Sequence, residues 1–311
     1  MLRVVFMGTP AFAVPSLRAL VEAGYDLAAI FTQPDRPAGR GGKLTAPPVK
    51  QAALELGLEV YQPESAKTDK AYAYLRDKNP DVIVVVGYGQ IISQRVLDLP
   101  RLGCVNVHSS LLPRLRGAAP INWAIVRGDK KTGVSTMKIV KKLDAGGILG
   151  VKETPIGDDE YAPALADRLA EMGAELLIET LQQLEKGAIT SQPQDDAAST
   201  YAPIMKREDG LVDWNLPAQE IYNRVRGFSP WPGAYSFFRG KRFHIHRARI
   251  TPGRAAPATM VIEGAVLKIG CGEGLLRALE VQLEGRRVMA SEDFVNGYRP
   301  ATGETLSDQA G

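Results

Sequence analysis

The chain has 311 residues, of which 45% are hydrophobic and 23% charged, and a formal net charge of +3 at pH 7. This length is sufficient for two domains, and the composition is typical of a soluble globular protein. So small a net charge does not by itself indicate a polyanionic partner. No apolar run approaches the roughly 20 residues that cross a bilayer, and the run within residues 1–8 is too short for a signal peptide. We therefore expect a cytoplasmic protein.

The first half of the chain alternates short β-branched runs with longer stretches of helical periodicity. Strands are predicted at residues 3–6, 27–31, 81–86 and 103–108, and helices at residues 15–23, 49–56, 118–126 and 162–186. This alternation predicts a doubly wound α/β fold with a mostly parallel, Rossmann-like sheet. Of the two cysteines, Cys104 falls in the apolar pattern of a strand, so we interpret it as part of the core. The wide separation of Cys104 from Cys271 suits a reducing compartment.

The second half of the chain changes character after residue 187. Residues 188–207 are polar and show no helical period, which is typical of a linker. Beyond them, short alternating segments at residues 234–239, 241–249 and 265–270 are punctuated by Gly and Pro and predict a small β domain, a barrel of the OB-like kind. We expect a catalytic domain at 1–188, a linker at 189–207 and a β-rich domain at 208–311.

Three predicted turns stand where a doubly wound sheet binds its ligands, beyond the carboxyl ends of its strands. They contain residues 87–90, the pair Asn106 and His108, and Asp144. Asn106 and His108 are two residues apart, so in a strand both side chains project to the same side. His108 is the one histidine of the first domain, and the apolar Leu111-Leu112-Pro113 that follows it, with arginines beyond, is typical of a fixed loop at a pocket mouth.

Two common kinds of site are disfavoured. Zinc requires three or four clustered ligands, and this domain offers one histidine and one cysteine in an apolar setting, so we expect no metal. The first turn, Gly8-Thr9-Pro10, lacks the spaced glycines of a dinucleotide-binding loop and has no phosphate-binding lysine after a glycine.

The motifs around His108 and Asp144 resemble those of a known family. The run Asn106-Val107-His108-Ser109-Ser110-Leu111-Leu112-Pro113 and, after it, Leu143-Asp144-Ala145-Gly146 resemble the two signatures of the folate-dependent formyltransferases. The resemblance covers nearly the whole first domain and is looser in the last hundred residues; within the family it is greatest to the members that act on methionyl-tRNA. The family usually has Gly and Thr where this chain has Lys142 and Ala145. Because Gly there could reflect a backbone angle that Lys adopts only at a cost, the shape of this loop is in question.

The resemblance implies an activity, two substrates and a set of site residues. It implies transfer of the formyl group of 10-formyltetrahydrofolate to the amino group of initiator methionyl-tRNA. We take a monomer as the default expectation, because nothing in the sequence indicates an oligomer. Such an acyl transfer needs oxyanion donors and a proton route, which Asn106, His108 and Asp144 can supply. The expected folate-binding residues lie in two loops: Ser110, Leu111, Leu112, Pro113, Gly87, Tyr88 and Gln90.

RNA binding is expected of two basic segments. Residues 221–262 contain eight Arg or Lys and no Asp or Glu, which fits contact with phosphates; Lys241, Arg242 and Arg247 are the candidates. The Gly/Pro-rich loop near residue 40 carries Arg36, Arg40 and Lys43, and by resemblance it enters the acceptor arm of the tRNA.

Several alternatives remain open. A formyltransferase acting on a sugar-nucleotide amine shares the Asn-x-His and Asp motifs but needs no acid-free basic stretch. A transformylase of nucleotide synthesis would end near residue 200. A deformylating hydrolase would usually carry a further N-terminal domain, whereas Met1 here stands directly before the first strand. A non-enzymatic RNA-binding module would explain the basic stretch but leaves Asn106, His108 and Asp144 without a role.

Overall fold

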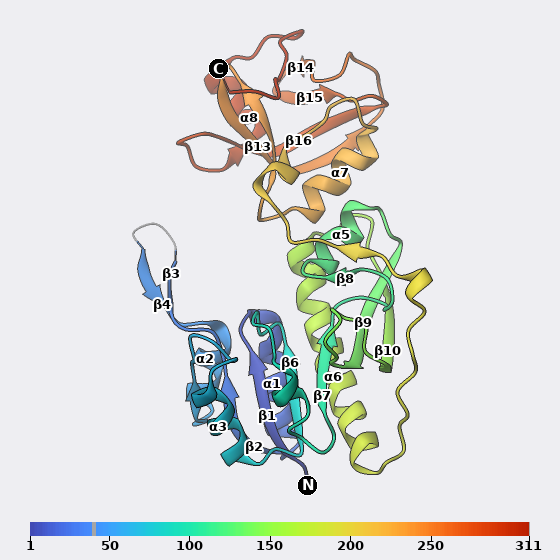
Figure 1. Ribbon diagram of the computed structural model, residues 1–311. Helices are drawn as coiled ribbons and strands as arrows, with labels where there is room; N and C mark the ends of the chain where they lie inside the picture. Colours follow the sequence, from blue (N-terminus) through green and yellow to red (C-terminus); the bar gives the residue numbers. More distant parts are fainter. Residues whose placement is uncertain (39–41, 311) are drawn as a thin grey trace. The chain divides into compact units, whose positions relative to one another are not determined.

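The computed structural model describes residues 1–38 and 42–310, which form two compact units (Figure 1). The first unit contains Met1–Gly117, Thr132–Pro155 and Ala166–Ala202. The second contains Ala118–Lys131, Ile156–Leu165 and the chain from Pro203 onward. Arg40, one of the residues that the sequence assigns to RNA binding, lies outside the described residues.

A seven-stranded sheet forms the centre of the first unit, with the strand order β10-β9-β7-β6-β1-β2-β5. The strands β5, β2, β1, β6 and β7 are parallel, whereas β9 runs antiparallel to β7. Their bounds are β1 (Arg3–Gly8), β2 (Asp26–Phe31), β5 (Val60–Tyr61), β6 (Val82–Val86), β7 (Cys104–His108), β9 (Lys131–Lys138) and β10 (Ile148–Pro155). The predicted doubly wound, mostly parallel fold is confirmed.

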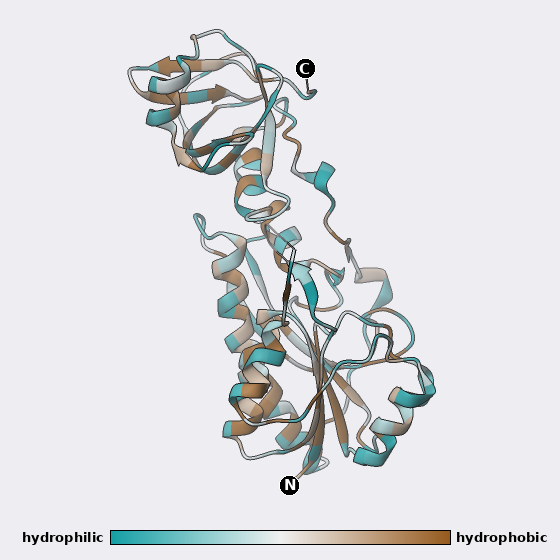
Figure 2. Ribbon diagram, turned by 90° about the vertical axis from the view of Figure 1, so that its left-hand side faces the viewer, coloured by the Kyte–Doolittle hydropathy of each residue, from teal (hydrophilic) through white to brown (hydrophobic). Residues whose placement is uncertain are grey.

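Helices cover both faces of this sheet because successive residues of a buried strand point to opposite sides. Val4 and Phe6 of β1 pack with α1 (Val14–Glu22), α2 (Pro48–Glu55) and α6 (Ala162–Glu185). Val5 and Met7 pack on the other face, with α3 (Asp69–Lys78) and α4 (Gln94–Leu97). Figure 2 shows the apolar strands between these layers. Cys104 is 2% exposed and packs on the same face as Val5 and Met7, so its interpretation as a core residue is confirmed.

Two small sheets complete the first unit. β3 (Arg36–Ala38) and β4 (Lys43–Thr45) form an antiparallel hairpin. β8 (Arg116–Gly117) pairs in parallel with β11 (Tyr201–Ala202). Residues 192–202, which fall in the predicted linker, therefore return across the first unit: Gln192 forms a bridge with Ile148, and the short 3-10 helix η2 (Asp196–Ala198) precedes β11. We call residues 192–202 the return segment.

The second unit is built on an antiparallel sheet of order β12-β13-β16-β15-β14, with β17 paired to β16. Its strands are β12 (Ala234–Phe238), β13 (Lys241–Thr251), β14 (Met260–Glu263), β15 (Val266–Gly270), β16 (Leu275–Leu283) and β17 (Met289–Ala290). Its helices are α5 (Pro120–Val126), η3 (Arg207–Gly210), α7 (Ala218–Gly227) and α8 (Ser291–Tyr298). The core includes Phe243 and Phe294, both fully buried. The predicted small β domain is confirmed, and its closure as an OB-like barrel stays a prediction.

The second unit includes α5, although α5 lies far from the rest of that unit in the sequence. The ring of Trp123 meets that of Phe228 edge to face at 5.6 Å, and the Asn122 side chain donates to the Gly227 carbonyl at 2.7 Å. Contacts of this kind are why the compact units do not coincide with the predicted divisions at 188 and 208, which stay predictions. Among the described residues, no helix combines the length and the apolar character that crossing a membrane requires.

Candidate active site

Strand β7 carries the two polar residues on which the site is built. Val105 and Val107 belong to the core on one face of the sheet, so Asn106 and His108 share the other face with Cys104. Asn106 is half-buried, and within the described part of the chain its carboxamide has no hydrogen-bond partner. A neutral amide at this strand end is therefore available to a ligand.

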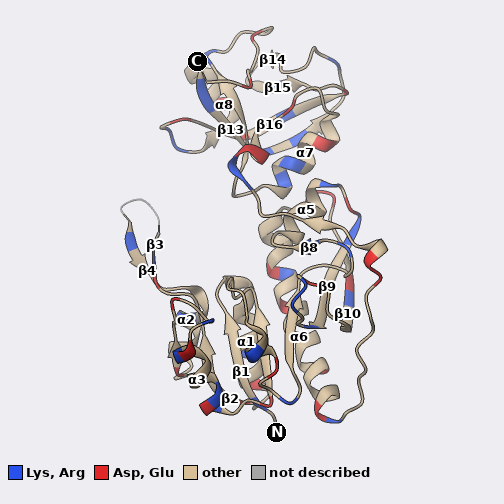
Figure 3. Cartoon of the chain, in the orientation of Figure 1, with Lys and Arg blue, Asp and Glu red and all other residues tan. Residues whose placement is uncertain are grey.

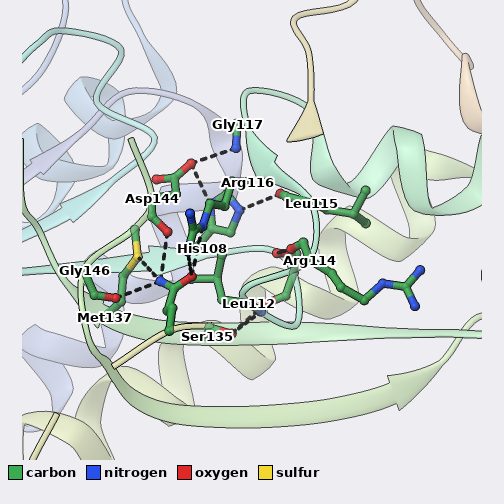
Figure 4. Close-up of polar contacts among 12 residues, drawn as sticks. His108, Leu112, Arg114, Leu115, Arg116, Gly117, Ser135, Met137, Asp144 and Gly146 are labelled. Atoms are coloured by element: carbon green, nitrogen blue, oxygen red, sulfur yellow. Dashed lines mark hydrogen bonds and ion pairs between the residues drawn. The ribbon is translucent and has the colours of Figure 1, made fainter. Parts of the chain in front are cut away.

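His108 is 7% exposed and makes two polar contacts (Figure 4). Its Nε2 lies 3.0 Å from the carbonyl oxygen of Leu115, and its Nδ1 lies 3.8 Å from Oδ2 of Asp144. A carbonyl oxygen can only accept a hydrogen bond, so Nε2 carries a proton in every charge state that keeps this contact. Nδ1 is therefore the ring nitrogen that can gain or lose a proton, and it faces a carboxylate.

Asp144 lies in the loop of residues 139–147, between β9 and β10. Its Oδ2 accepts a hydrogen bond from the backbone N–H of Gly117 at 2.8 Å, and its side chain is 13% exposed. The loop folds so closely against β9 that a Cβ at Gly146 would lie 1.7 Å from the carbonyl oxygen of Lys138. Since β9 is antiparallel to β7, the prediction that Asp144 follows a strand end of the parallel sheet is wrong: this loop carries the carboxylate to His108.

The Asp144 loop contains a residue with left-handed backbone, but this residue is not Lys142, where the sequence comparison raised the question of a left-handed angle. Asp144 has φ +46°, whereas Lys142 is not among the described residues with positive φ. Lys142 thus takes the place of the family's usual glycine without a left-handed backbone, and its ammonium pairs with the carboxylate of Asp196. That pair, with a second bond from Arg116, holds the pKa of Asp196 below its usual value.

The loop that follows His108 is fixed by two serines. The hydroxyl of Ser110 donates to the Arg114 carbonyl at 2.7 Å. The hydroxyl of Ser135 donates to the Ser110 carbonyl at 2.7 Å and accepts from the backbone N–H of Leu112 at 3.2 Å. Ser110 and Leu112 are buried, whereas Leu111 and Pro113 are half-buried. Of the four residues predicted for folate, the latter two are the more accessible.

The second predicted folate loop presents backbone rather than side chains. The Tyr88 ring is 1% exposed in the core, and burial raises the pKa of its hydroxyl to about 12. The Tyr88 carbonyl accepts bonds from Thr9 and Gln33 at 3.0 and 3.2 Å. Gln90 turns its side chain away to accept from the Ala66 N–H at 2.6 Å. Exposed surface is left at Gly87, whose φ is +57°.

Gln194 contacts the Asp144 loop directly and Arg116 contacts Gln194, and sequence reasoning gave neither residue a role. Gln194 donates to the carbonyls of Asp144 and Gly146, and Arg116 donates in turn to Gln194. Arg116 is one of the arginines that follow Leu111-Leu112-Pro113 in the sequence. Gln194 lies in a polar stretch without periodicity. Nothing in such a stretch indicates that one of its residues contacts a loop far away in the sequence.

Comparison with known families decides the class of protein. A family described as formyl transferase matches residues 2–181, and its C-terminal domain matches residues 204–299. This chain belongs to the formyl transferase family. All the catalytic and folate candidates of this formyl transferase fall within the first match, whereas Gln194 falls between the two.

Two relatives support this assignment, and a solved structure shares the fold. The chain is 54% identical to the methionyl-tRNA formyltransferase of Koribacter versatilis, over 97% of each chain. It is 51% identical to the methionyl-tRNA formyltransferase of Solibacter usitatus, over 99% of each chain. An N-formyltransferase from Helicobacter canadensis, solved with folinic acid and dTDP-3-aminofucose, shares the fold with a TM-score of 0.67 at 16% identity, over 89% of this chain and 99% of that one. Among the described residues of this formyl transferase, no group of three or more His, Cys, Asp or Glu could hold a metal ion.

The basic hairpin of this formyl transferase is anchored at its base. Arg36 and Lys43 lie exposed on β3 and β4. Just before β3, the Asp35 carboxylate accepts from Gln62 at 2.8 Å and from Lys50 at 2.8 and 2.7 Å. The hydrogen bond from Gln62, followed by those from Lys50, holds the pKa of Asp35 below its usual value. The anchor leaves both hairpin cations exposed, Arg36 with one long bond to the Gln33 side chain at 3.4 Å.

The three basic candidates of the second unit lie on β13 in different settings. Lys241 is exposed. The Arg242 guanidinium lies 4.8 Å from the centre of the Tyr235 ring, a cation–π contact. Arg247 lies 4.0 Å from the Glu280 carboxylate. Lys241 is thus the candidate whose charge is least engaged.

Other cations of the acid-free stretch are committed to the fold of the second unit. Arg226 is 4% exposed and donates to the carbonyls of Gly157 and Glu160 and to the side chain of Asn223. Arg239 forms a two-pronged pair with Glu304, at 2.7 and 3.0 Å. A run of positive charge in the sequence therefore does not form one continuous basic surface.

Proposed function

We propose that this protein transfers the formyl group of 10-formyltetrahydrofolate to the α-amino group of initiator methionyl-tRNA, giving N-formylmethionyl-tRNA for translation initiation. The observation that carries the proposal is the identity of 54% and 51%, along nearly the whole of both chains, to proteins named methionyl-tRNA formyltransferase. We further propose that it works in the cytoplasm as a monomer.

The reaction is an acyl transfer between two nitrogens. The amine nitrogen attacks the formyl carbon, a tetrahedral oxyanion forms, and the bond from that carbon to the folate nitrogen breaks. The proton lost by the attacking amine must reach the leaving nitrogen. The protein therefore has to supply hydrogen-bond donors to the oxyanion and a group that exchanges a proton near neutral pH.

Asn106, His108 and Asp144 are suited to these tasks. The Asn106 carboxamide has no partner in the described part of the chain, so it can donate to the oxyanion. His108 is held through Nε2 by the Leu115 carbonyl, which leaves Nδ1 to carry the proton. The Asp144 carboxylate, 3.8 Å away, stabilises the ring when it is charged. No covalent intermediate on the protein is needed.

The folate is proposed to lie between the loop of residues 110–113 and the loop of residues 87–90. The exposed glycines at 87 and 89, both with positive φ, offer bare backbone that a flat ring can approach closely. Ile91, next to this loop, is 72% exposed and adds apolar surface. These features fit a heterocycle that needs both backbone hydrogen bonds and an apolar contact.

The RNA is proposed to meet exposed cations of both units. In the first unit these are Arg36 and Lys43 of the hairpin. Arg40, which lies outside the described residues, is proposed from the sequence alone. In the second unit they are Lys241 and, beyond the residues predicted from the sequence, Arg249 and Arg254, which are exposed as well. Contacts of this kind go to phosphates and position the nucleic acid without reading its sequence.

One assay separates this proposal from its alternatives. The protein is incubated with 10-formyltetrahydrofolate and, in parallel, with methionyl-tRNA, a sugar-nucleotide amine, or water as acceptor. Formylated methionyl-tRNA as the main product supports the proposal. A formylated sugar amine, free formate, or no turnover would reject it in favour of the sugar enzyme, the hydrolase or the RNA-binding module.

A further inference from the structure

The loop that carries Asp144 lies against β9 at Gly146, but the residues just before Asp144 face solvent. Residues 141–143 are exposed, and Asp144 itself has φ +46°, a left-handed conformation that residues other than glycine rarely adopt. Such a conformation persists where surrounding contacts hold it. Contacts from other parts of the chain must therefore hold this loop.

The Gln194 carboxamide makes two of these contacts. Its Nε2 donates to the Asp144 carbonyl at 2.9 Å and to the Gly146 carbonyl at 2.7 Å. One NH2 group thus joins the residue on either side of Ala145, and fixes the backbone from which the catalytic candidate Asp144 projects. The residues involved are separated by 50 and 48 positions in the sequence.

Arg116 fixes the orientation of that carboxamide. Its Nε and Nη2 donate to Oε1 of Gln194 at 3.0 and 2.8 Å, so the oxygen end faces Arg116 and the NH2 end must face the loop. Arg116 is 6% exposed, and its Nη1 donates to the Asp196 carboxylate at 2.8 Å. The amide cannot flip without placing NH2 against a guanidinium.

The return segment also holds the other side of the site. The backbone N–H groups of Leu115 and Arg116 donate to Thr200, at 2.8 Å to its hydroxyl and 2.9 Å to its carbonyl. The residues held in this way supply the Leu115 carbonyl that contacts His108 and the Gly117 N–H that contacts Asp144 (Figure 4). A single segment therefore sets both partners of the His108–Asp144 pair.

We propose that Gln194, oriented by Arg116, is a positioning residue that fixes Asp144 opposite His108 during formyl transfer. The inference rests on the proposed function of the site. Gln194 lies outside both stretches that match the family, at residues 2–181 and 204–299, so the matches assign it nothing. It touches no reacting atom and acts through the backbone of the Asp144 loop.

The test compares two substitutions at Gln194 with a matched control. Gln194→Glu keeps an acceptor for Arg116 but sets oxygen against two carbonyl oxygens, and Gln194→Met removes the polar contacts without adding charge. Gln192→Glu is the control, because Gln192 is exposed in the same segment and is held by its backbone. We expect kcat to fall about 10- to 100-fold in both Gln194 variants, the order of loss for a misplaced catalytic group. In the Gln194 variants, KM for folate, KM for RNA and the melting temperature should change little. In the Gln192→Glu control, kcat should stay close to wild type as well.

A double-mutant cycle distinguishes positioning of Asp144 from a general structural role. In single-turnover assays, Gln194→Met should cost less than about twofold when Asp144→Asn is already present, because the residue it positions is no longer functional. A full loss in that background, or unchanged kcat in the single variants, would overturn the inference. Its failure is distinct from failure of the proposed function, since wild-type protein that does not formylate methionyl-tRNA rejects the function before any variant is made. The cycle is then run with the acceptor that the three-acceptor assay identifies.

Discussion

The strand end at Asn106 and His108 and the acid-free stretch of residues 221–262 both stand out in the sequence, but the structure treats them differently. At the strand end, the residues chosen by spacing lie together, with His108 and Asp144 facing each other at 3.8 Å. In the acid-free stretch, the cations separate into buried, paired and exposed groups. Figure 3 shows where Lys and Arg fall along the backbone of the second unit.

The difference shows which sequence patterns predict that residues lie together in the folded protein. Spacing within one strand fixes which side chains share a face, so Asn106 and His108 must lie on one side. A charge run fixes no such relation, because the acids that neutralise it come from elsewhere in the chain. Glu304 reaches Arg239 from 65 residues away. Neutral groups from distant segments engage the cations as well, as the Gly157 carbonyl does for Arg226 from 69 residues away. Absence of acids in a segment does not mean absence of acids around it.

The largest expected effect is at the strand end. Asn106→Ala, His108→Ala and Asp144→Asn should each reduce kcat for formyl transfer by about 10² or more, the usual loss for an oxyanion or proton-transfer group. Melting temperatures should stay close to wild type. His246→Gln, a histidine in the second unit, is the control. A well-folded variant of the set with normal turnover would have no place in the mechanism.

Much of this site was predictable, and what was not has a physical reason. The sheet, its strand end and Asp144 follow from periodicity and motif, although the antiparallel β9 did not. Gln194 was not predictable because its role exists only once the return segment lies across the Asp144 loop. Tyr88 was expected, by resemblance, to line the folate pocket through its backbone, and that its ring belongs to the core could not be read from the motif. Motif and periodicity report local order, whereas these roles arise from contacts between distant segments.

The next effect concerns stability and separates the buried cations from the exposed ones. Arg226→Met should lower the free energy of unfolding of the second unit by about 2–4 kcal/mol, because it leaves two carbonyls and the Asn223 side chain without their buried donor. Arg224→Met, on the same helix, should cost far less. Chemical denaturation of both variants checks this. Equal losses would mean that the buried contacts of Arg226 contribute nothing special.

A pH effect is expected from His244, which lies against Tyr235 and His246. Burial above all, then the charges of His246, Arg242 and Arg207, lowers its pKa to about 4, while Glu284 opposes the shift. The unfolded chain, with the ordinary pKa near 6.5, binds the proton first on acidification, so this contribution to stability is full above about pH 6.5 and falls toward pH 4. The melting temperature should therefore fall less between pH 7 and 4.5 in His244→Phe than in wild type. Parallel curves would show that His244 titrates normally.

The hairpin anchor should affect RNA turnover more than folate binding. Lys50→Met removes two bonds to Asp35, leaving the β3–β4 hairpin less well fixed. We expect kcat/KM for methionyl-tRNA to fall about fivefold, a modest loss because Gln62 still holds Asp35, with KM for folate unchanged. Arg40→Ala should show the same pattern. Lys70→Met, on the exposed surface of α3, serves as control. Equal loss of folate binding would indicate that the hairpin base belongs to the folate pocket.

The smallest effect tests the exposed cations of the second unit one at a time. If Lys241 and Arg249 meet RNA phosphates, each contact releases condensed counterions, and affinity for methionyl-tRNA falls steeply with salt. Lys241→Gln or Arg249→Gln should flatten the slope of log affinity against log salt by about one unit each.

Arg239→Gln is the matched control for these two substitutions. Its charge is already neutralised by Glu304, so few counterions remain for RNA to release, and the slope should barely move. In the Lys241 and Arg242 double variant we expect a change nearer one unit than two, because Arg242 lies over the Tyr235 ring. If Arg239 flattened the slope as much as Lys241, pairing would not separate the two classes of cation. A wild-type slope near zero would remove this unit from RNA binding altogether.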